Sequence, residues 1–183
     1  MLKKICGILF LLVAIFLAVA AMQPEDFRVT RSKRVAGHPE VVFAHVNDLR
    51  QWDAWSPWAK LDPNAKSSFE GPSAGVGAAM TWDGNGEVGA GKMTITESSP
   101  AQLVRLRLDF EKPFRATNQA ELTFAPEGSE TLVTWTMTGK NNLIGKAISL
   151  VMNCDKMIGG YFEKGLSNLD AVVRAEASGQ TPS

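Results

Sequence analysis

The chain is poor in the side chains from which disulfide frameworks, metal sites and acid–base pairs are built. Its 183 residues include two cysteines, two histidines and one tyrosine. Cys6 lies in an apolar N-terminal run and Cys154 in the rest of the chain, so we do not expect them to pair. His38 and His45 have no aspartate or cysteine at a recognisable catalytic or metal-binding spacing and are expected at the surface. The sequence therefore predicts no metal site and no cofactor.

An excess of charge of one sign is also missing. Nineteen lysine and arginine residues balance nineteen aspartate and glutamate residues. A nucleic-acid backbone is held by a basic surface, and this composition does not supply one. We therefore expect no nucleic-acid partner.

Charge is absent altogether between Ile5 and Met22, a run of 18 residues that follows Lys3 and Lys4. This length is at the short end of a bilayer span, and the small residues at 18–20 also fit a signal-peptide cleavage site. We expect residues 1–22 to form a membrane anchor, with a cleaved signal as the alternative. The short basic start favours an extracytoplasmic domain, which would be secreted if the segment is cleaved.

The remaining residues, about 155, suffice for one domain and not for two. We place this domain at 27–175 and expect a disordered tail at 176–183. A first strand is predicted at 27–36, a short helix from Pro39 to Arg50, and a long connection at 60–77. A terminal helix begins near Leu143 and could bend at Gly159-Gly160. Between them lie five alternating runs, at 78–83, 87–97, 103–110, 115–124 and 131–139.

Short turn-forming segments separate these runs, which predicts consecutive hairpins. The fold class is therefore α+β, with a curved antiparallel sheet of about six strands wrapped around a long C-terminal helix. Gly91, Ala116, Ala120 and Gly139 fall among large residues on the inward faces and would leave room for a cavity. Asn118 is the one polar residue on those faces, and we expect either a satisfied hydrogen bond or a ligand contact there.

Three of the five tryptophans occur in the segment WDAWSPW at 52–58. They could form an aromatic rim around a pocket or plug the gap between the short helix and the sheet. We favour the plug for Trp52, whereas Trp55 and Trp58 fit either role.

Three segments, RVAGHPEVVF at 34–43, WDAWSPW, and GYFEKGLSNL at 160–169, resemble the SRPBCC superfamily, also called START-like or polyketide cyclase/dehydrase-like. The resemblance covers roughly residues 27–174. It implies a helix-grip fold in which the last helix closes a hydrophobic cavity. Members bind lipids, sterols, polyketides or hydrophobic hormones, and some catalyse cyclisation, so the resemblance does not choose one activity.

Binding of a lipid-like or polyketide-like molecule by a membrane-associated domain is the function we expect. No carboxylate is predicted on an inward face, so an enzyme is not favoured. The alternative is a cyclase or dehydrase using Asn118, Thr81 and Tyr161, and a third hypothesis is a scaffold with a filled core. The candidate ligand-binding residues are Trp55, Trp58, Trp82, Met93, Leu106, Leu108, Phe114, Asn118, Trp135, Met137, Met157, Tyr161 and Phe162.

Overall fold

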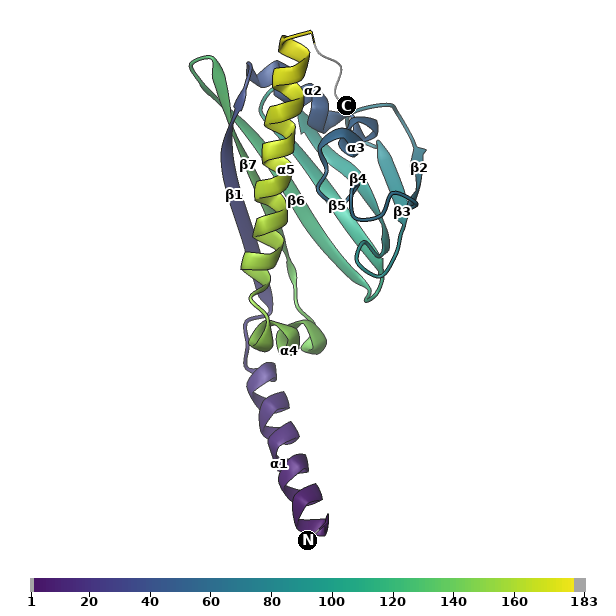
Figure 1. Cartoon of the computed structure of the whole chain (residues 1–183), viewed down its shortest axis with the longest axis vertical. Coiled ribbons are helices and arrows are strands. Elements are labelled where there is room, and N and C mark those ends of the chain that lie inside the picture. The colour runs from purple at the N-terminus through teal and green to yellow at the C-terminus, as the bar shows by residue number, and fades with distance from the viewer. Residues whose placement is uncertain (1, 180–183) are drawn as a thin grey trace.

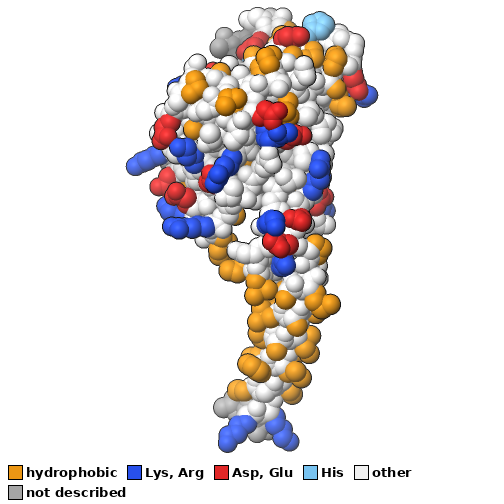
Figure 2. Space-filling view, turned by 180° about the vertical axis from the view of Figure 1, so that it is seen from behind, with side chains coloured by type: hydrophobic (Ala, Val, Ile, Leu, Met, Phe, Trp, Pro, Cys, Tyr) orange, Lys and Arg blue, Asp and Glu red, His pale blue; other side chains and the backbone are white. Residues whose placement is uncertain are grey.

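The computed structural model describes residues 2–179 and shows a curved sheet, a long C-terminal helix along it and an N-terminal stalk (Figure 1). The stalk is helix α1 (Leu2–Ala21). Its segment Lys3–Ala21 has the length and apolar composition of a membrane span, which are also those of a signal sequence. Figure 2 shows apolar side chains around the stalk and at its junction with the domain.

Seven antiparallel strands form the sheet, in the order β1-β7-β6-β5-β4-β3-β2. The first strand therefore pairs with the last, and the others follow as hairpins, which confirms the predicted hairpins. The bounds are β1 (Asp26–Ala36), β2 (Lys66–Glu70), β3 (Ala79–Asp83), β4 (Ala90–Ser99), β5 (Leu103–Lys112), β6 (Ala116–Glu127) and β7 (Glu130–Lys140).

Strand β2 lies within the segment at 60–77 that was expected to be a connection, so that expectation is wrong. Four of its five residues are exposed, and only Phe69 is half-buried. An edge strand with no buried face lacks the apolar alternation by which strands are recognised. Its pairing with β3 is consequently visible only in the folded structure.

Three short helical segments follow β1. Helix α2 (Pro39–Asn47) begins with Pro39 in its first turn, as predicted. It ends earlier than Arg50 because the Asp48 side chain accepts a hydrogen bond from the Arg50 backbone N–H and starts a separate 3₁₀ turn, η1 (Leu49–Gln51). Helix α3 (Trp52–Trp55) comes next.

The C-terminal part is two helices, α4 (Leu143–Val151) and α5 (Cys154–Ala177), where one was expected. They separate at Asn153, whose side chain caps α5 by accepting from the Lys156 backbone N–H. Helix α5 continues through Gly159-Gly160 without interruption. A Cβ at Gly159 would clash with the Arg31 guanidinium, so this glycine lets Arg31 lie against the helix. Of the expected tail, Glu176 and Ala177 belong to α5, and 180–183 lie outside the described residues.

The core lies between the concave face of the sheet and α5, which runs along β1, and α2 and α3 fill in beside it (Figure 1). This arrangement confirms the helix-grip fold. His45, expected at the surface, is instead buried in α2. Its ring pairs with the Glu176 carboxylate at 3.1 Å and so joins α2 to the end of α5.

Candidate functional site

The burial of inward-facing side chains changes along the length of the concave face. Near α2, inward side chains are fully buried, and near α1 and α4 they are half-buried or exposed. In β5, Val104 and Leu106 are buried, whereas Leu108 and Phe110 are half-buried. In β6, Ala120 is buried and Asn118 half-buried. We call the first region the closed half and the second the open half.

The closed half is filled by an aromatic plug, made of Trp52, Trp55, Trp135 and Phe162. The Trp135 and Phe162 rings stack with centroids 4.3 Å apart. Trp52 and Trp55 pack on Trp135 at 5.9 and 5.6 Å. Their indole N–H groups donate to the backbone carbonyls of Val46 and His45. The plug alternative is therefore confirmed for Trp52, and Trp55 shares that role.

Close approach of α5 to the sheet completes this packing. A Cβ at Gly165 would lie 2.9 Å from the Trp135 ring and 3.1 Å from Pro57. Only glycine allows the helix so near. The closed half therefore has protein side chains where a deep cavity was expected.

Small residues on the inward faces do not leave room either. A Cβ at Gly91 would lie 2.8 Å from the Trp82 ring, and one at Gly139 would clash with Asn118 Oδ1 and the Phe27 ring. Large neighbouring side chains thus occupy the space over both glycines. The expectation of a cavity is therefore wrong at Gly91 and Gly139, because their cross-strand partners were not visible in one strand's pattern.

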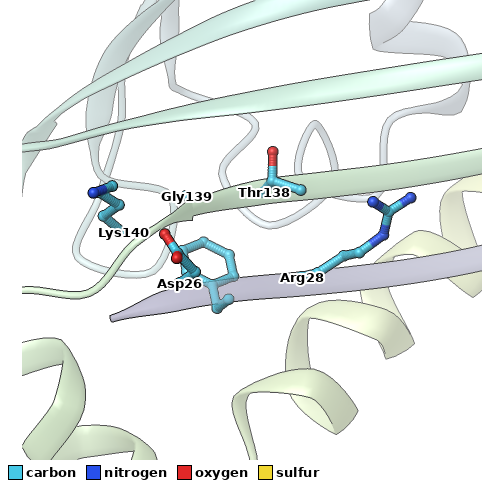
Figure 3. A pocket seen from close by; sticks show the side chains of 6 residues that line it. Asp26, Arg28, Thr138, Gly139 and Lys140 are labelled. Carbon is cyan, nitrogen blue, oxygen red and sulfur yellow. The ribbon is translucent and has the colours of Figure 1, made fainter. Parts of the chain in front are cut away.

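Two of the hollows on the described surface lie over the sheet. One, of about 430 Å³, lies over the ends of β1 and β7 and is lined by Asp26, Arg28, Thr138 and Lys140 among others (Figure 3). The other, of about 350 Å³, lies over β2 to β5 and is lined by residues such as Lys66, Thr81 and Glu111. Neither includes a residue of α5, so neither is the expected cavity.

The open half is lined by partly exposed apolar and aromatic side chains. Trp58 stands against Tyr161 with ring centroids 5.6 Å apart and against the plug at Trp135. Trp82 packs edge-on against Phe110 at 5.7 Å. Phe114 and Met157 remain exposed, at 52% and 45%. The open half therefore consists of apolar side chains that the protein covers only in part.

Asn118 is the polar group of this surface. It pairs across the sheet with Leu108 on one side and Gly139 on the other. Its side-chain oxygen, Oδ1, is buried and has no hydrogen-bond partner among the described residues. The expectation of a satisfied hydrogen bond is therefore wrong. Trp135 Nε1 also lacks a partner, but aromatic rings surround it inside the plug.

The candidate residues from the sequence divide between the two halves. The closed half contains Trp55, Leu106, Trp135, Met137 and Phe162, all of them buried. Met93 is buried too, but it pairs with Leu108 at the boundary between the halves. The open half contains Trp58, Trp82, Leu108, Phe114, Asn118, Met157 and Tyr161. Sequence reasoning left out Phe27, Phe110 and Ile158, which are partly buried near the same surface. The inward alternation of β5 indicated Phe110, but the place of Phe27 depends on the β1–β7 pairing.

Charged groups with displaced pKa values lie away from the Asn118 row. On the outer face, Arg107 donates to the Asp109 carboxylate and, with Thr117, holds the pKa of Asp109 below its ordinary value. Arg31 does the same for the pKa of Asp155 at the start of α5. Thr81, named for a catalytic role, points to the outer face and hydrogen-bonds to Ser68. The displaced pKa values of Asp109 and Asp155 therefore come from direct pairing with arginine at the surface.

The sequence matches the protein family described as "Polyketide cyclase / dehydrase and lipid transport" over residues 26–174. The chain belongs to this family. Membership, together with the fold, supports a hydrophobic ligand-binding domain. No protein with a curated functional description matches the chain.

Solved structures show the same fold at low sequence identity. Protein CV1439 from Chromobacterium violaceum is 16% identical with a TM-score of 0.57, covering 82% of this chain and 98% of its own. Ms6760 from Mycobacterium smegmatis is 16% identical with a TM-score of 0.58, covering 81% and 92%. CalU16 from Micromonospora echinospora is 14% identical with a TM-score of 0.53, covering 85% and 90%.

Proposed function

We propose that this protein is a membrane-anchored domain that binds an amphipathic small molecule in the open half of its concave face. The ligand's apolar part would cover Leu108, Trp82 and the Trp58–Tyr161 pair. Asn118 Oδ1 is buried in the ligand-free structure. It would accept a hydrogen bond from a hydroxyl or amide N–H of the ligand once the Asn118 side chain turns toward the ligand. The single observation that carries this proposal is the buried, unpartnered Asn118 oxygen within a partly exposed apolar surface.

The physical argument is the cost of an orphaned acceptor. A buried polar atom without a hydrogen bond destabilises a protein by about 1–3 kcal/mol. Buried polar groups are nearly always paired, so an exception calls for an explanation. A ligand donor at this position would remove the cost, and the exposed apolar side chains around it would gain burial at the same time.

The proposal is tested by measuring whether a ligand stays bound to the purified protein. Full-length protein extracted from membranes in mild detergent would be examined by native mass spectrometry, in the wild type, in Asn118→Leu and in Gln119→Leu. Gln119 is the matched control because it is the neighbouring residue and is exposed on the outer face. We expect a bound mass in the wild type and in Gln119→Leu, and a loss of about tenfold or more in Asn118→Leu.

A stability measurement shows whether Asn118→Leu loses the ligand because binding is impaired or because the protein no longer folds. Replacing an unsatisfied amide by leucine should leave the ligand-free protein as stable as the wild type or more so. Equal retention by all three proteins, or no bound mass in any of them, would contradict the proposed site.

Anchoring is the second element of the proposal. We propose that α1 stays attached and inserts into the bilayer, with the domain on the extracytoplasmic side. Helix α1 packs against α4, and its Ala20 is fully buried, so the folded domain uses the end of α1 as part of its structure. Resistance to carbonate extraction and an intact mass that includes residues 1–22 are expected. A mature protein that begins beyond Ala21 would show a cleaved signal instead.

A further inference from the structure

Helix α4 leaves half of its apolar side chains exposed, and the other three, Ala147, Ile148 and Leu150, are half-buried. None of its nine residues is buried. Leu143, Ile144 and Val151 are 49%, 50% and 72% exposed, and Met152 follows at 48%. At helical spacing these residues share one side, whereas Lys146 and Ser149 fall on the other. A surface helix of a soluble domain normally turns such a side toward its core.

The position of α4 indicates what covers it. The helix packs against α1 and lies across the top of the stalk, where the segment Lys3–Ala21 ends (Figure 1). Twenty helical residues extend about 30 Å, the thickness of the hydrocarbon core. With α1 inserted, α4 would therefore lie at the level of the lipid headgroups.

We propose that α4 is an interfacial helix that lies in the plane of the membrane beside α1, with Leu143, Ile144 and Val151 buried among lipid acyl chains. An amphipathic helix with an apolar side of this kind binds at the boundary between headgroups and acyl chains. Lys146, which has no ion-pair partner within residues 2–179, reaches the headgroup phosphates from the polar side. This inference rests on the membrane insertion of α1 proposed above.

The orientation of the binding surface follows from this placement. Only Met152 and Asn153 separate α4 from α5. Exposed Met157 lies in the first turn of α5, at the end of the concave face where the open half is found. Interfacial α4 therefore brings the open half next to the bilayer. The ligand class is then a membrane amphiphile that enters from the lipid, not a solute from the surrounding water.

Depth-dependent fluorescence quenching tests the proposal on the full chain. Val151→Cys in a Cys6→Ser, Cys154→Ser background would be labelled with an NBD fluorophore and reconstituted in phosphatidylcholine–phosphatidylglycerol vesicles. Some of the phosphatidylcholine would carry a nitroxide near the start of its acyl chain. Val151 is largely exposed, so this substitution is not expected to impair folding.

Two labelled positions serve as matched controls. Ser149→Cys lies on the opposite side of α4, and Ser129→Cys lies in the β6–β7 turn at the far end of the sheet. We expect a blue-shifted emission and loss of most of the emission at 151, weaker quenching at 149, and none at 129.

The other outcomes each overturn a distinct statement. Equal quenching at 151 and 129 in carbonate-resistant protein would overturn the interfacial placement alone. A blue shift at 151 without lipid quenching would indicate that protein, such as a second copy of the chain, covers α4. Release of the protein by carbonate would overturn the insertion of α1 and this inference with it.

Discussion

The closed and open halves of the concave face are built from the same strands but differ in how far other elements cover them. Leu106 and Leu108 are both inward-facing residues of β5, yet the first is fully buried and the second is not. In the closed half, tryptophan rings supply the packing. In the open half, apolar and aromatic side chains of the same kinds lie partly exposed at the protein surface. An inward-facing residue is therefore part of the core only where another element packs over it.

The closed and open halves are also expected to differ in how much they contribute to stability. A packed interior leaves no surface for a ligand, and an uncovered apolar surface contributes little to the free energy of unfolding until something binds it. In this protein the aromatic plug fills the closed half, and the proposed binding residues around Asn118 are only partly covered.

The largest effect should come from tryptophan removal in each half. Trp135→Ala is expected to lower the free energy of unfolding by about 3–5 kcal/mol, because it leaves a cavity inside the plug. Trp82→Ala, in the open half, should lose on the order of 1–2 kcal/mol, since part of that ring is already exposed. Denaturant titration in detergent measures both. Similar losses at the two positions would remove the distinction between the halves, and Trp135→Phe serves if the alanine variant does not fold.

Alanine substitutions at Gly139 and Gly160 test how tightly the sheet is packed beneath the open half. Gly139→Ala should cost about 1–3 kcal/mol, because the new Cβ would clash with Asn118 and Phe27. Gly160→Ala, where nothing lies within 4 Å, should gain up to about 1 kcal/mol from helix propensity. If Gly139→Ala does not lower the free energy of unfolding, the sheet surface beneath the open half is adaptable. Its ligand preference should then be broad.

The smallest effect concerns the ion pair that holds the start of α5 to β1 beside the open half. Arg31 lowers the pKa of Asp155, so the pair should stabilise the folded state above the ordinary aspartate pKa of about 4 and lose this contribution as the pH falls through the lowered value. Asp155→Asn should therefore melt slightly below the wild type at pH 7, with the gap closing in acid.

Thermal melting at a series of pH values measures this difference, and Asp53→Asn provides an exposed control with no ion-pair partner within the described residues. A gap that persists at low pH would mean that Asp155 acts through something other than its charge. Faster amide exchange in the first turn of α5 in Asp155→Asn would show that the pair limits opening of this half.

Local patterns explain which parts of the fold were predicted. Alternation in β5, β6 and β7 gave the inward faces correctly, because a buried face forces a period of two. The capping residue Asp48 and the exposed edge strand β2 were missed, since neither leaves an apolar signal. Asn118 was recognised as an inward polar residue. Its lack of a partner depends on Gly139 and Leu108, which are adjacent only after the strands pair.

Hydrophobic spacing in the sequence was enough to predict the apolar N-terminal helix, the antiparallel sheet and the amphipathic C-terminal helix, because this spacing follows directly from helix and strand geometry. Which inward residues are covered could be read only from the packed fold. Burial depends on the distance between elements remote in sequence, such as the approach of Gly165 to Trp135. For the same reason, the plug and the open half became distinguishable only when α5 was in place along the sheet.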